Sequence, residues 1–259
     1  MPLTISTRNA RFQQWEALLH NRSKRHRAGE FLVQGVRPVT LAVEHGWPIH
    51  ALLHRSGCGL SQWAQDLIDS LNTLHVAMAG DLLEELGEKD AAPELVAVVG
   101  QRPDDLSRIP AGGLVVVFDR PTSPGNLGTL IRSADALGAA GVIVTGHAAD
   151  VYDPKTVRAS TGSRFSVPVV RTDSVPSVPA GSLVVGLDEG GPTELAEVDL
   201  TGSVMLVVGN ETRGISAGWR SACDVVAHIP ISGAASSLNA AAAASIALYE
   251  AARQRSRPG

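Results

Sequence analysis

The sequence predicts an α/β protein in two parts: a small N-terminal α/β/α domain and a larger C-terminal domain built on a parallel sheet. Apolar runs rich in Val, Leu and Ile recur along the 259 residues and alternate with helical segments. In the second half these runs are continuously apolar, which is typical of parallel strands covered on both faces. Residues 100–113 concentrate Pro, Gly and charge and predict a linker. We therefore expect domains over residues 1–105 and 113–259.

The N-terminal domain is expected to alternate short apolar strands with helices, a pattern typical of a small α/β/α sandwich. Its strands are expected over residues 31–33, 49–54, 74–77 and 95–99, and its helices over residues 8–19, 39–45, 62–71 and 82–86.

The C-terminal domain is expected to contain six strands, with helices between and after them. Apolar positions in residues 127–137 recur at helical spacing and form one core-facing side. Five alanines at 240–244 begin another helix, either as ordinary helix formers or because small residues permit close helix packing. The strands are expected over residues 114–118, 142–145, 167–170, 183–187, 204–208 and 225–229.

Composition restricts the class of protein. Hydrophobic residues make up 44% of the chain and charged residues 19%, as in ordinary globular proteins, and the apolar runs are too short to span a bilayer. The first residues lack the apolar stretch of a signal peptide, and the two cysteines form no disulfide or metal pattern. We therefore expect a cytoplasmic protein without membrane association.

The charge is unevenly distributed. The net charge is −4, yet residues 1–40 contain seven Lys or Arg and two Glu, a local balance of +5. Contacts with phosphates need local positive charge rather than a positive total. The alternative is a solvated basic helix end. The candidate phosphate-contacting residues are Arg22, Lys24, Arg25 and Arg27.

Three short segments of the second half place polar residues at the end of an apolar run. They are Asn-Leu-Gly-Thr-Leu-Ile-Arg at 126–132, Val-Val-Gly-Asn-Glu-Thr-Arg-Gly at 207–214, and Ile-Pro-Ile-Ser-Gly-Ala-Ala-Ser-Ser-Leu-Asn at 229–239. Open α/β sheets bind ligands at the edge where the strands end and the loops begin. The three segments therefore predict one shared site.

Arg132 is expected opposite the apolar side of its helix. Because helical side chains lean toward the N-terminus, it should reach back over residues 124–126, unless it pairs with Asp135 or another carboxylate. Asn126 either caps this helix or holds the substrate side of the loop. Glu211 is either a site residue or a surface carboxylate that pairs with Arg213.

Gly209 would let a ligand approach the backbone closely. By themselves, Ser237 and Asn239 are also typical of a helix N-terminus. The sequence contains no phosphate-binding Walker motif, no dinucleotide fingerprint, no nucleophile elbow and no residues at metal-ligand spacing. It therefore predicts no metal site.

Together the three segments resemble the signature motifs of the SpoU/TrmH family, the SPOUT-class RNA ribose 2′-O-methyltransferases that use S-adenosyl-L-methionine. Residues 23–37 resemble, more loosely, the ribosomal-protein-like substrate-binding domain that precedes many of these enzymes. The resemblance implies methyl transfer to a ribose 2′-hydroxyl of structured RNA, a trefoil knot in the C-terminal domain and a homodimer. Ribosomal RNA is the expected substrate. The alternatives are tRNA, or a non-catalytic RNA-binding assembly factor on the same fold.

The resemblance also implies residue roles. Arg132 is the expected catalytic residue, either helping to deprotonate the hydroxyl or anchoring a phosphate and stabilising the developing alkoxide. Glu211 is expected to organise the site and could hold Arg132 as a buried ion pair would. Asn126, Ser237 and Asn239 complete the expected catalytic set. The expected cofactor-binding residues are Leu187, Gly209, Asn210, Ile229, Ile231 and Leu238, and Arg158 and Arg164 are further candidate RNA contacts.

Overall fold

The computed structural model describes residues 3–87 and 93–256. The chain divides into two compact units: Met1–Arg102 with Tyr152–Val157, and Pro103–Val151 with Arg158–Gly259. The division after Arg102 falls within the predicted linker. The short segment Tyr152–Val157 belongs to the first unit although it lies far along the chain, and nothing in the sequence pattern indicates this.

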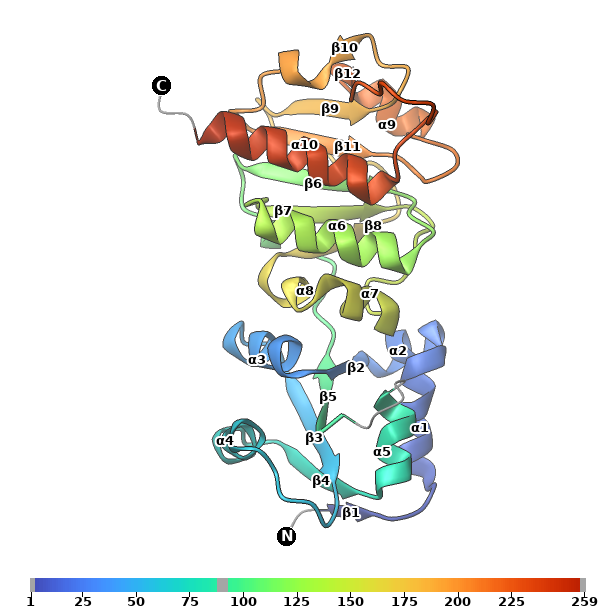
Figure 1. Ribbon diagram of the computed structural model, residues 1–259, viewed down its shortest axis with the longest axis vertical. Coiled ribbons are helices and arrows are strands. Elements are labelled where there is room, and N and C mark those ends of the chain that lie inside the picture. Colours follow the sequence, from blue (N-terminus) through green and yellow to red (C-terminus); the bar gives the residue numbers. More distant parts are fainter. Residues whose placement is uncertain (1–2, 88–92, 257–259) are drawn as a thin grey trace. The chain divides into compact units, whose positions relative to one another are not determined.

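The first unit contains a five-stranded sheet in the order β1-β4-β3-β5-β2 (Figure 1). Strand β5 runs antiparallel to β2 and β3, and the other pairs are parallel. The strands are β1 (Leu3–Ile5), β2 (Glu30–Gln34), β3 (Ile49–Arg55), β4 (Leu74–Met78) and β5 (Leu95–Gly100), and the helices are α1 (Ala10–His20), α2 (Arg22–Ala28), α3 (Val36–Glu44), α4 (Gln62–Ser70) and α5 (Gly80–Gly87).

Strand β1 and helix α2 are the two elements of this unit that the sequence pattern did not predict. Strand β1 has only three residues. Helix α2 has no apolar periodicity, and its ends are set by local chemistry instead. The side chain of Asn21 accepts a hydrogen bond from the Lys24 amide and caps the helix, while Gly29 ends it in the left-handed region at φ 64°.

The second unit contains a seven-stranded, fully parallel sheet in the order β10-β12-β9-β11-β6-β7-β8. The predicted α/β class and parallel sheet are confirmed, whereas the knot stays a prediction. The strands are β6 (Leu114–Asp119), β7 (Gly141–Thr145), β8 (Val169–Thr172), β9 (Leu183–Leu187), β10 (Thr193–Glu194), β11 (Val204–Val208) and β12 (Val225–His228). The helices from the linker onward are η1 (Leu106–Arg108), α6 (Pro124–Ala136), α7 (Pro154–Ser160), α8 (Ser163–Ser166), η2 (Leu195–Glu197), α9 (Ala217–Ala222) and α10 (Ala240–Arg255).

Helices cover both faces of this sheet. On one face α6 and α10 lie side by side (Figure 1), joined by a 2.7 Å hydrogen bond between the hydroxyls of Ser133 and Ser245. The alanines of α10 that face inward are buried, so small size serves close helix packing here. On the other face Trp219 of α9 packs among buried residues of the strands. Within residues 3–87 and 93–256, no helix is long and apolar enough to cross a membrane.

The register of the strands shows which strand ends lie next to one another at the edge of the sheet. Val208 at the end of β11 is paired with Phe118 of β6 on one side and with Leu187 of β9 on the other, and Ala227 of β12 is also paired with Leu187. The carboxyl ends of four parallel strands therefore meet at one edge. The chain order also changes direction between β11 and β6, and such switch points are where open α/β sheets bind ligands.

Candidate active site

A pocket of about 390 Å³ opens at this edge of the second unit. Its size is within the range of small-molecule and cofactor sites, roughly 300–1,000 Å³. Two of the expected catalytic residues, Glu211 and Ser237, lie on its wall. The wall also includes all six residues that were expected to bind a cofactor, namely Leu187, Gly209, Asn210, Ile229, Ile231 and Leu238.

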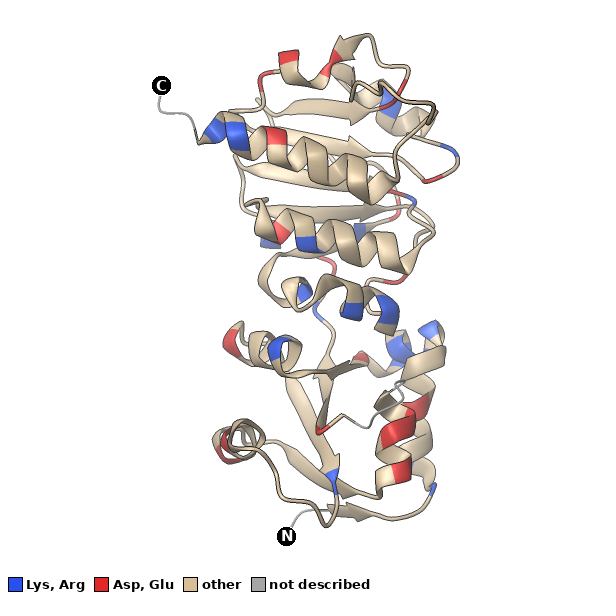
Figure 2. Cartoon of the chain, in the orientation of Figure 1, with Lys and Arg blue, Asp and Glu red and all other residues tan. Residues whose placement is uncertain are grey.

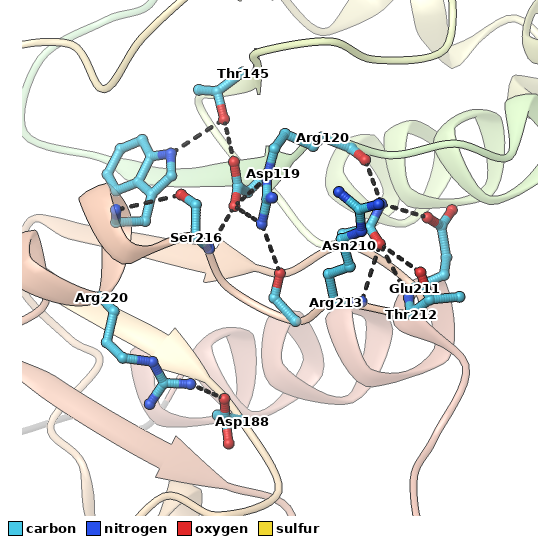
Figure 3. A network of polar contacts seen from close by, with 12 residues as sticks. Asp119, Arg120, Thr145, Asp188, Asn210, Glu211, Thr212, Arg213, Ser216 and Arg220 are labelled. Carbon is cyan, nitrogen blue, oxygen red and sulfur yellow. Dashed lines mark hydrogen bonds and ion pairs between the residues drawn. The ribbon is translucent and has the colours of Figure 1, made fainter.

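The pocket wall carries acidic groups as well as apolar ones. Asp188 and Glu189 follow the end of β9 and line the pocket. Asp188 is ion-paired with Arg220 of α9 (Figure 3). Within residues 3–87 and 93–256, no three His, Cys, Asp or Glu side chains are grouped so that they could hold a metal ion.

Residues 209–216, here called the pocket loop, form a tight turn after β11. The backbone amides of Asn210 and Gly214 each donate to the other's carbonyl at 3.0 Å. The buried Asn210 side chain organises the turn: its Oδ1 accepts from the amides of Thr212 and Arg213 and from the Thr212 hydroxyl, all at 3.0 Å. Asn210 therefore holds the loop's own shape with its side chain while it lines the pocket.

Gly209 is required by this turn. A Cβ atom at Gly209 would lie 2.3 Å from the carbonyl carbon of Gly214 and 2.4 Å from the amide nitrogen of Ile215. These neighbours are backbone atoms, which cannot swing aside as a flexible side chain can. The close neighbours of Gly209 in the structure are therefore backbone atoms of its own loop, and close approach of a ligand to this glycine stays a prediction.

Glu211 joins the pocket loop to the start of α6. Its carboxylate accepts from the Thr122 amide at 3.0 Å, the Thr122 hydroxyl at 2.9 Å and the Ser123 amide at 3.1 Å. It also accepts from Asn126 Nδ2 at 3.2 Å. Burial alone raises the pKa of Glu211, but the hydrogen bonds outweigh it, so the pKa lies below its usual value. The expected ion pair with Arg132 is not formed, nor is one with Arg213, because neutral donors occupy the carboxylate.

This lowered pKa predicts a pH dependence. A carboxyl group whose pKa is lower in the folded state contributes stability that is present above its unfolded pKa, about 4.3, and is lost as pH falls through the folded pKa. We expect the free energy of unfolding of the wild type to exceed that of Glu211→Gln at neutral pH, and the difference to shrink below about pH 4. Urea unfolding of both proteins across this range measures it. A difference that does not vary with pH would contradict the carboxylate role.

Asn126 and Asn239 extend the same chain of hydrogen bonds. Asn239 Nδ2 donates to Asn126 Oδ1 at 3.1 Å, and Asn239 Oδ1 caps α10 by accepting from the amides of Ala241 and Ala242. Asn126 does not cap α6, because that position is taken by Ser123, whose hydroxyl accepts from the Asn126 amide at 3.2 Å. Glu211, Asn126 and Asn239 thus connect the three segments that the sequence singled out.

Arg132 lies on the exposed side of α6, outside the pocket wall. Its Nη1 donates to the hydroxyl of Thr161 at 3.4 Å, and the expected reach back over residues 124–126 stays a prediction. Thr161 has a positive φ of 51°, which is strained for a β-branched residue. No described carboxylate forms an ion pair with Arg132, so its positive charge is available to an anionic partner.

The candidate RNA-contacting residues differ in how far they are buried. Lys24 and Arg27 of α2 are exposed, and Arg22 of α2 and Arg158 of α7 are half-buried; Figure 2 shows the basic residues of both helices. Arg25, by contrast, is 2% exposed and Arg164 is 0% exposed. The structure therefore does not support direct phosphate contact by Arg25 or Arg164.

The burial of Arg25 has a local cause. Its guanidinium donates to the carbonyls of Leu18 at 2.7 Å and Leu19 at 3.1 Å, in the last turn of α1, where helical carbonyls lack intrahelical partners. It also forms an ion pair with Asp153 at 3.4 Å. A count of basic residues in the sequence cannot distinguish such a helix-terminal arginine from an exposed one.

The sequence pattern missed the residues that hold the site together. Thr122 and Ser123 donate to Glu211, while Asp119 and Arg120 at the end of β6 contact the pocket loop. A signal was available for Asp119, because it is a charged residue directly after the apolar run 114–118.

The fold and site define the chain as an α/β protein with a cofactor-sized pocket at the carboxyl edge of a parallel sheet, and comparison with known proteins gives its family. Residues 9–97 match the SpoU L30e-like domain and residues 113–249 match the SpoU rRNA Methylase family. The chain belongs to the SpoU rRNA methylase family.

Two relatives match almost the whole chain. It is 58% identical over 264 residues to a 23S rRNA (uridine(2479)-2′-O)-methyltransferase of Streptomyces viridochromogenes, covering 97% of this chain and 92% of the relative. It is 30% identical over 251 residues to the 23S rRNA (guanosine(2553)-2′-O)-methyltransferase RlmP of Bacillus subtilis, covering 94% and 96%. The crystal structure of the SpoU methyltransferase AviRb from S. viridochromogenes in complex with AdoMet superposes with a TM-score of 0.90 at 57% identity, covering 96% of this chain and 98% of that one.

Proposed function

We propose that this protein transfers a methyl group from S-adenosyl-L-methionine to a ribose 2′-hydroxyl of ribosomal RNA. The observation that carries the proposal is the meeting of three distant segments at the carboxyl edge of a parallel sheet. Two of them line one pocket, and the first is joined to them by the hydrogen bonds of Asn126 with Glu211 and Asn239. Two relatives that match more than 90% of the chain are named as 23S rRNA 2′-O-methyltransferases, which favours ribosomal RNA over tRNA. The intact constellation of polar residues argues against a non-catalytic assembly factor.

The pocket suits this cofactor chemically. Leu187, Ile229, Ile231 and Leu238 supply apolar surface for a planar base, and backbone groups of the surrounding loops supply hydrogen bonds. The carboxylate of Glu189, next to the Asp188–Arg220 ion pair on the pocket wall, suits a cationic ligand. When bound, S-adenosyl-L-methionine supplies a methyl group that its positive sulfonium has already activated, so no metal is needed.

Arg132 would act on the RNA side of the reaction. A guanidinium has a pKa above about 12 and rarely gives up its proton, so we assign it an electrostatic role. Its exposed cation would hold the phosphate beside the target ribose and stabilise the negative charge that develops on the 2′-oxygen as the hydroxyl loses its proton. Glu211, held by neutral donors, would fix the pocket loop relative to the helix that carries Arg132.

Site-specific mapping of 2′-O-methylation tests the proposed reaction. The full-length protein is incubated with S-adenosyl-L-methionine and unmethylated 23S rRNA, and with bulk tRNA in parallel. We expect a single new 2′-O-methyl group in the ribosomal RNA and none in tRNA. Methylation of tRNA alone would replace the proposed substrate, and binding of the cofactor without methylation of either RNA would favour the assembly factor.

The basic residues of α2 other than the buried Arg25 are expected to supply RNA affinity through phosphates. Neutralising Arg22, Lys24 and Arg27 to Gln should weaken RNA binding and flatten the plot of log affinity against log salt by about 0.7–0.9 for each phosphate that is no longer neutralised. Filter binding with a 23S rRNA fragment measures the slope. The buried Arg25 is left in place so that the fold is undisturbed.

A matched control removes charge elsewhere on the same unit. Arg11 of α1 and Arg37 of α3 are both exposed, and their change to Gln should leave the slope nearly unaltered. Equal slopes for all three proteins would show that the α2 cluster is only a solvated surface.

We further propose a homodimer that works in the cytoplasm, where its ribosomal RNA substrate is found. The support for a dimer is the apolar surface of α10, on which Ile246 is 42% exposed and Tyr249 is 61% exposed. Sedimentation velocity of the wild type and of Tyr249→Glu should show a dimer and a weakened dimer, respectively. A wild type that sediments as a monomer at micromolar concentration would contradict this proposal.

A further inference from the structure

The end of β6 carries a buried carboxylate whose three partners come from different parts of the second unit. Asp119 is 2% exposed. Its Oδ1 accepts from the Thr145 hydroxyl at 2.9 Å, and its Oδ2 accepts from the Ser216 amide at 2.8 Å and from Arg120 Nε at 3.1 Å (Figure 3). Thr145 in turn accepts from the indole N–H of Trp219 at 3.1 Å. A buried carboxylate with this many donors is rigidly held.

Arg120 adds two contacts to the pocket loop that Asp119 does not make. Its guanidinium Nη2 donates to the Gly214 carbonyl at 3.1 Å, and its own carbonyl accepts from Asn210 Nδ2 at 2.6 Å. Asn210 and Gly214 are hydrogen-bonded to each other through their backbones and lie on opposite sides of the loop's turn. One residue at the end of β6 therefore holds both sides of a loop that lies about ninety positions further along the chain.

The backbone of Arg120 is strained to make these contacts. Its φ is +53°, a region that residues with a Cβ rarely adopt. Such strain persists only where surrounding contacts determine the conformation, and it is concentrated at functional sites. In this conformation the main-chain carbonyl and the guanidinium of Arg120 both face the loop, as Figure 3 shows.

We propose that Arg120 is a positioning residue for the cofactor. It preorganises the pocket loop, whose residues from Gly209 to Gly214 line the pocket, but it does not lie on the wall itself. The inference rests on the proposed function, because the ligand whose affinity it sets is S-adenosyl-L-methionine. A loop that is already ordered before binding loses less conformational entropy on binding, so affinity rises without any added contact to the ligand.

Two substitutions separate the guanidinium from the backbone strain. Arg120→Gly removes the side chain and makes a positive φ acceptable, whereas Arg120→Ala removes the side chain and retains the strain. Arg108→Ala is the control: this half-buried arginine also donates to a backbone carbonyl, that of Pro103 at 2.9 Å, but it lies on η1 outside the pocket wall.

Two measurements are made on each full-length protein. Hydrogen–deuterium exchange of the peptide covering residues 209–216, without cofactor, reports loop order. Calorimetric titration with S-adenosyl-L-methionine reports affinity, and steady-state kinetics separate KM for the cofactor from kcat. We expect both Arg120 variants to exchange faster in the loop and to bind about tenfold more weakly, the effect of losing a hydrogen bond from a charged group. KM should rise more than kcat falls.

Two results would overturn this inference, and a third would overturn the proposed function instead. If Arg120→Gly exchanges and binds like the wild type while Arg120→Ala does not, backbone strain rather than the guanidinium governs the loop, and the inference is overturned. Unchanged loop exchange in both variants overturns it as well, whatever the affinities. If the wild type itself does not bind S-adenosyl-L-methionine, the proposed function fails, while the exchange data still decide whether Arg120 orders the loop.

Discussion

Arg132→Ala is expected to reduce methyl transfer by about 10²- to 10³-fold or more, the usual cost of removing a group that stabilises a developing oxyanion. Affinity for S-adenosyl-L-methionine should stay close to that of the wild type, because Arg132 lies outside the pocket wall. Arg132→Lys should also transfer the methyl group slowly, because the compact ammonium group of Lys cannot reproduce the planar set of hydrogen-bond donors of a guanidinium. Single-turnover methylation and calorimetric titration measure the two effects separately.

A control for this experiment is Arg253→Ala. Arg253 lies near the far end of α10 and pairs with Glu250 three residues away, so its loss should leave methylation intact. Near-normal turnover of Arg132→Ala would show that Arg132 is peripheral. Loss of cofactor affinity together with activity would instead show that Arg132 acts through the pocket.

Gly209→Ala is expected to abolish cofactor binding. The added Cβ would lie 2.3 Å from backbone at Gly214, so the pocket loop must move. Overpacking of this kind costs roughly 1–3 kcal/mol in stability. The displaced loop also carries Glu211, so its hydrogen bonds to Thr122 and Ser123 should weaken. Calorimetric titration measures the loss of cofactor binding, and thermal unfolding measures the loss of stability.

Gly202→Ala is the matched control in the same unit. A Cβ at Gly202 meets nothing within 4 Å and its φ is not positive, so binding and stability should change little. If Gly209→Ala binds the cofactor normally, displacement of the pocket loop does not affect binding. The assignment of this pocket as the cofactor site would then have to be revised.

The fold could be predicted from the sequence where burial imposes a repeating pattern. Strands β9 and β11 begin and end at the predicted residues because both faces of the sheet are covered and their runs are uniformly apolar. Strand β8 begins two residues later than predicted, at Val169, because the apolar run that contains it starts before the ladder with β7. Helix α2 was missed because capping, rather than apolar periodicity, defines it.

The site was predictable as a location but not as a set of contacts. Polar residues at strand ends identified the edge of the sheet. Which groups meet there depends on the pairing of β6 with β11, strands ninety residues apart, and no local pattern encodes that register. For this reason Glu211 was expected beside Arg132, whereas it contacts Thr122, Ser123 and Asn126 instead. The charge of Arg25 was visible in the sequence, but its burial was not.

The parallel sheet has a consequence for how this protein is made. The hydrogen bonds that assemble the site join residues 85 and 113 positions apart, as Asn126 does with Glu211 and Asn239. Contacts so distant in sequence form late and slowly, since loop-closure entropy must be overcome first. A nascent chain that has emerged as far as β9 already contains Arg132 and the whole basic helix α2, but lacks the loops that form most of the pocket wall. Because Ala240 and Ala243 of α10 line the pocket, the complete pocket wall can form only after synthesis has reached α10.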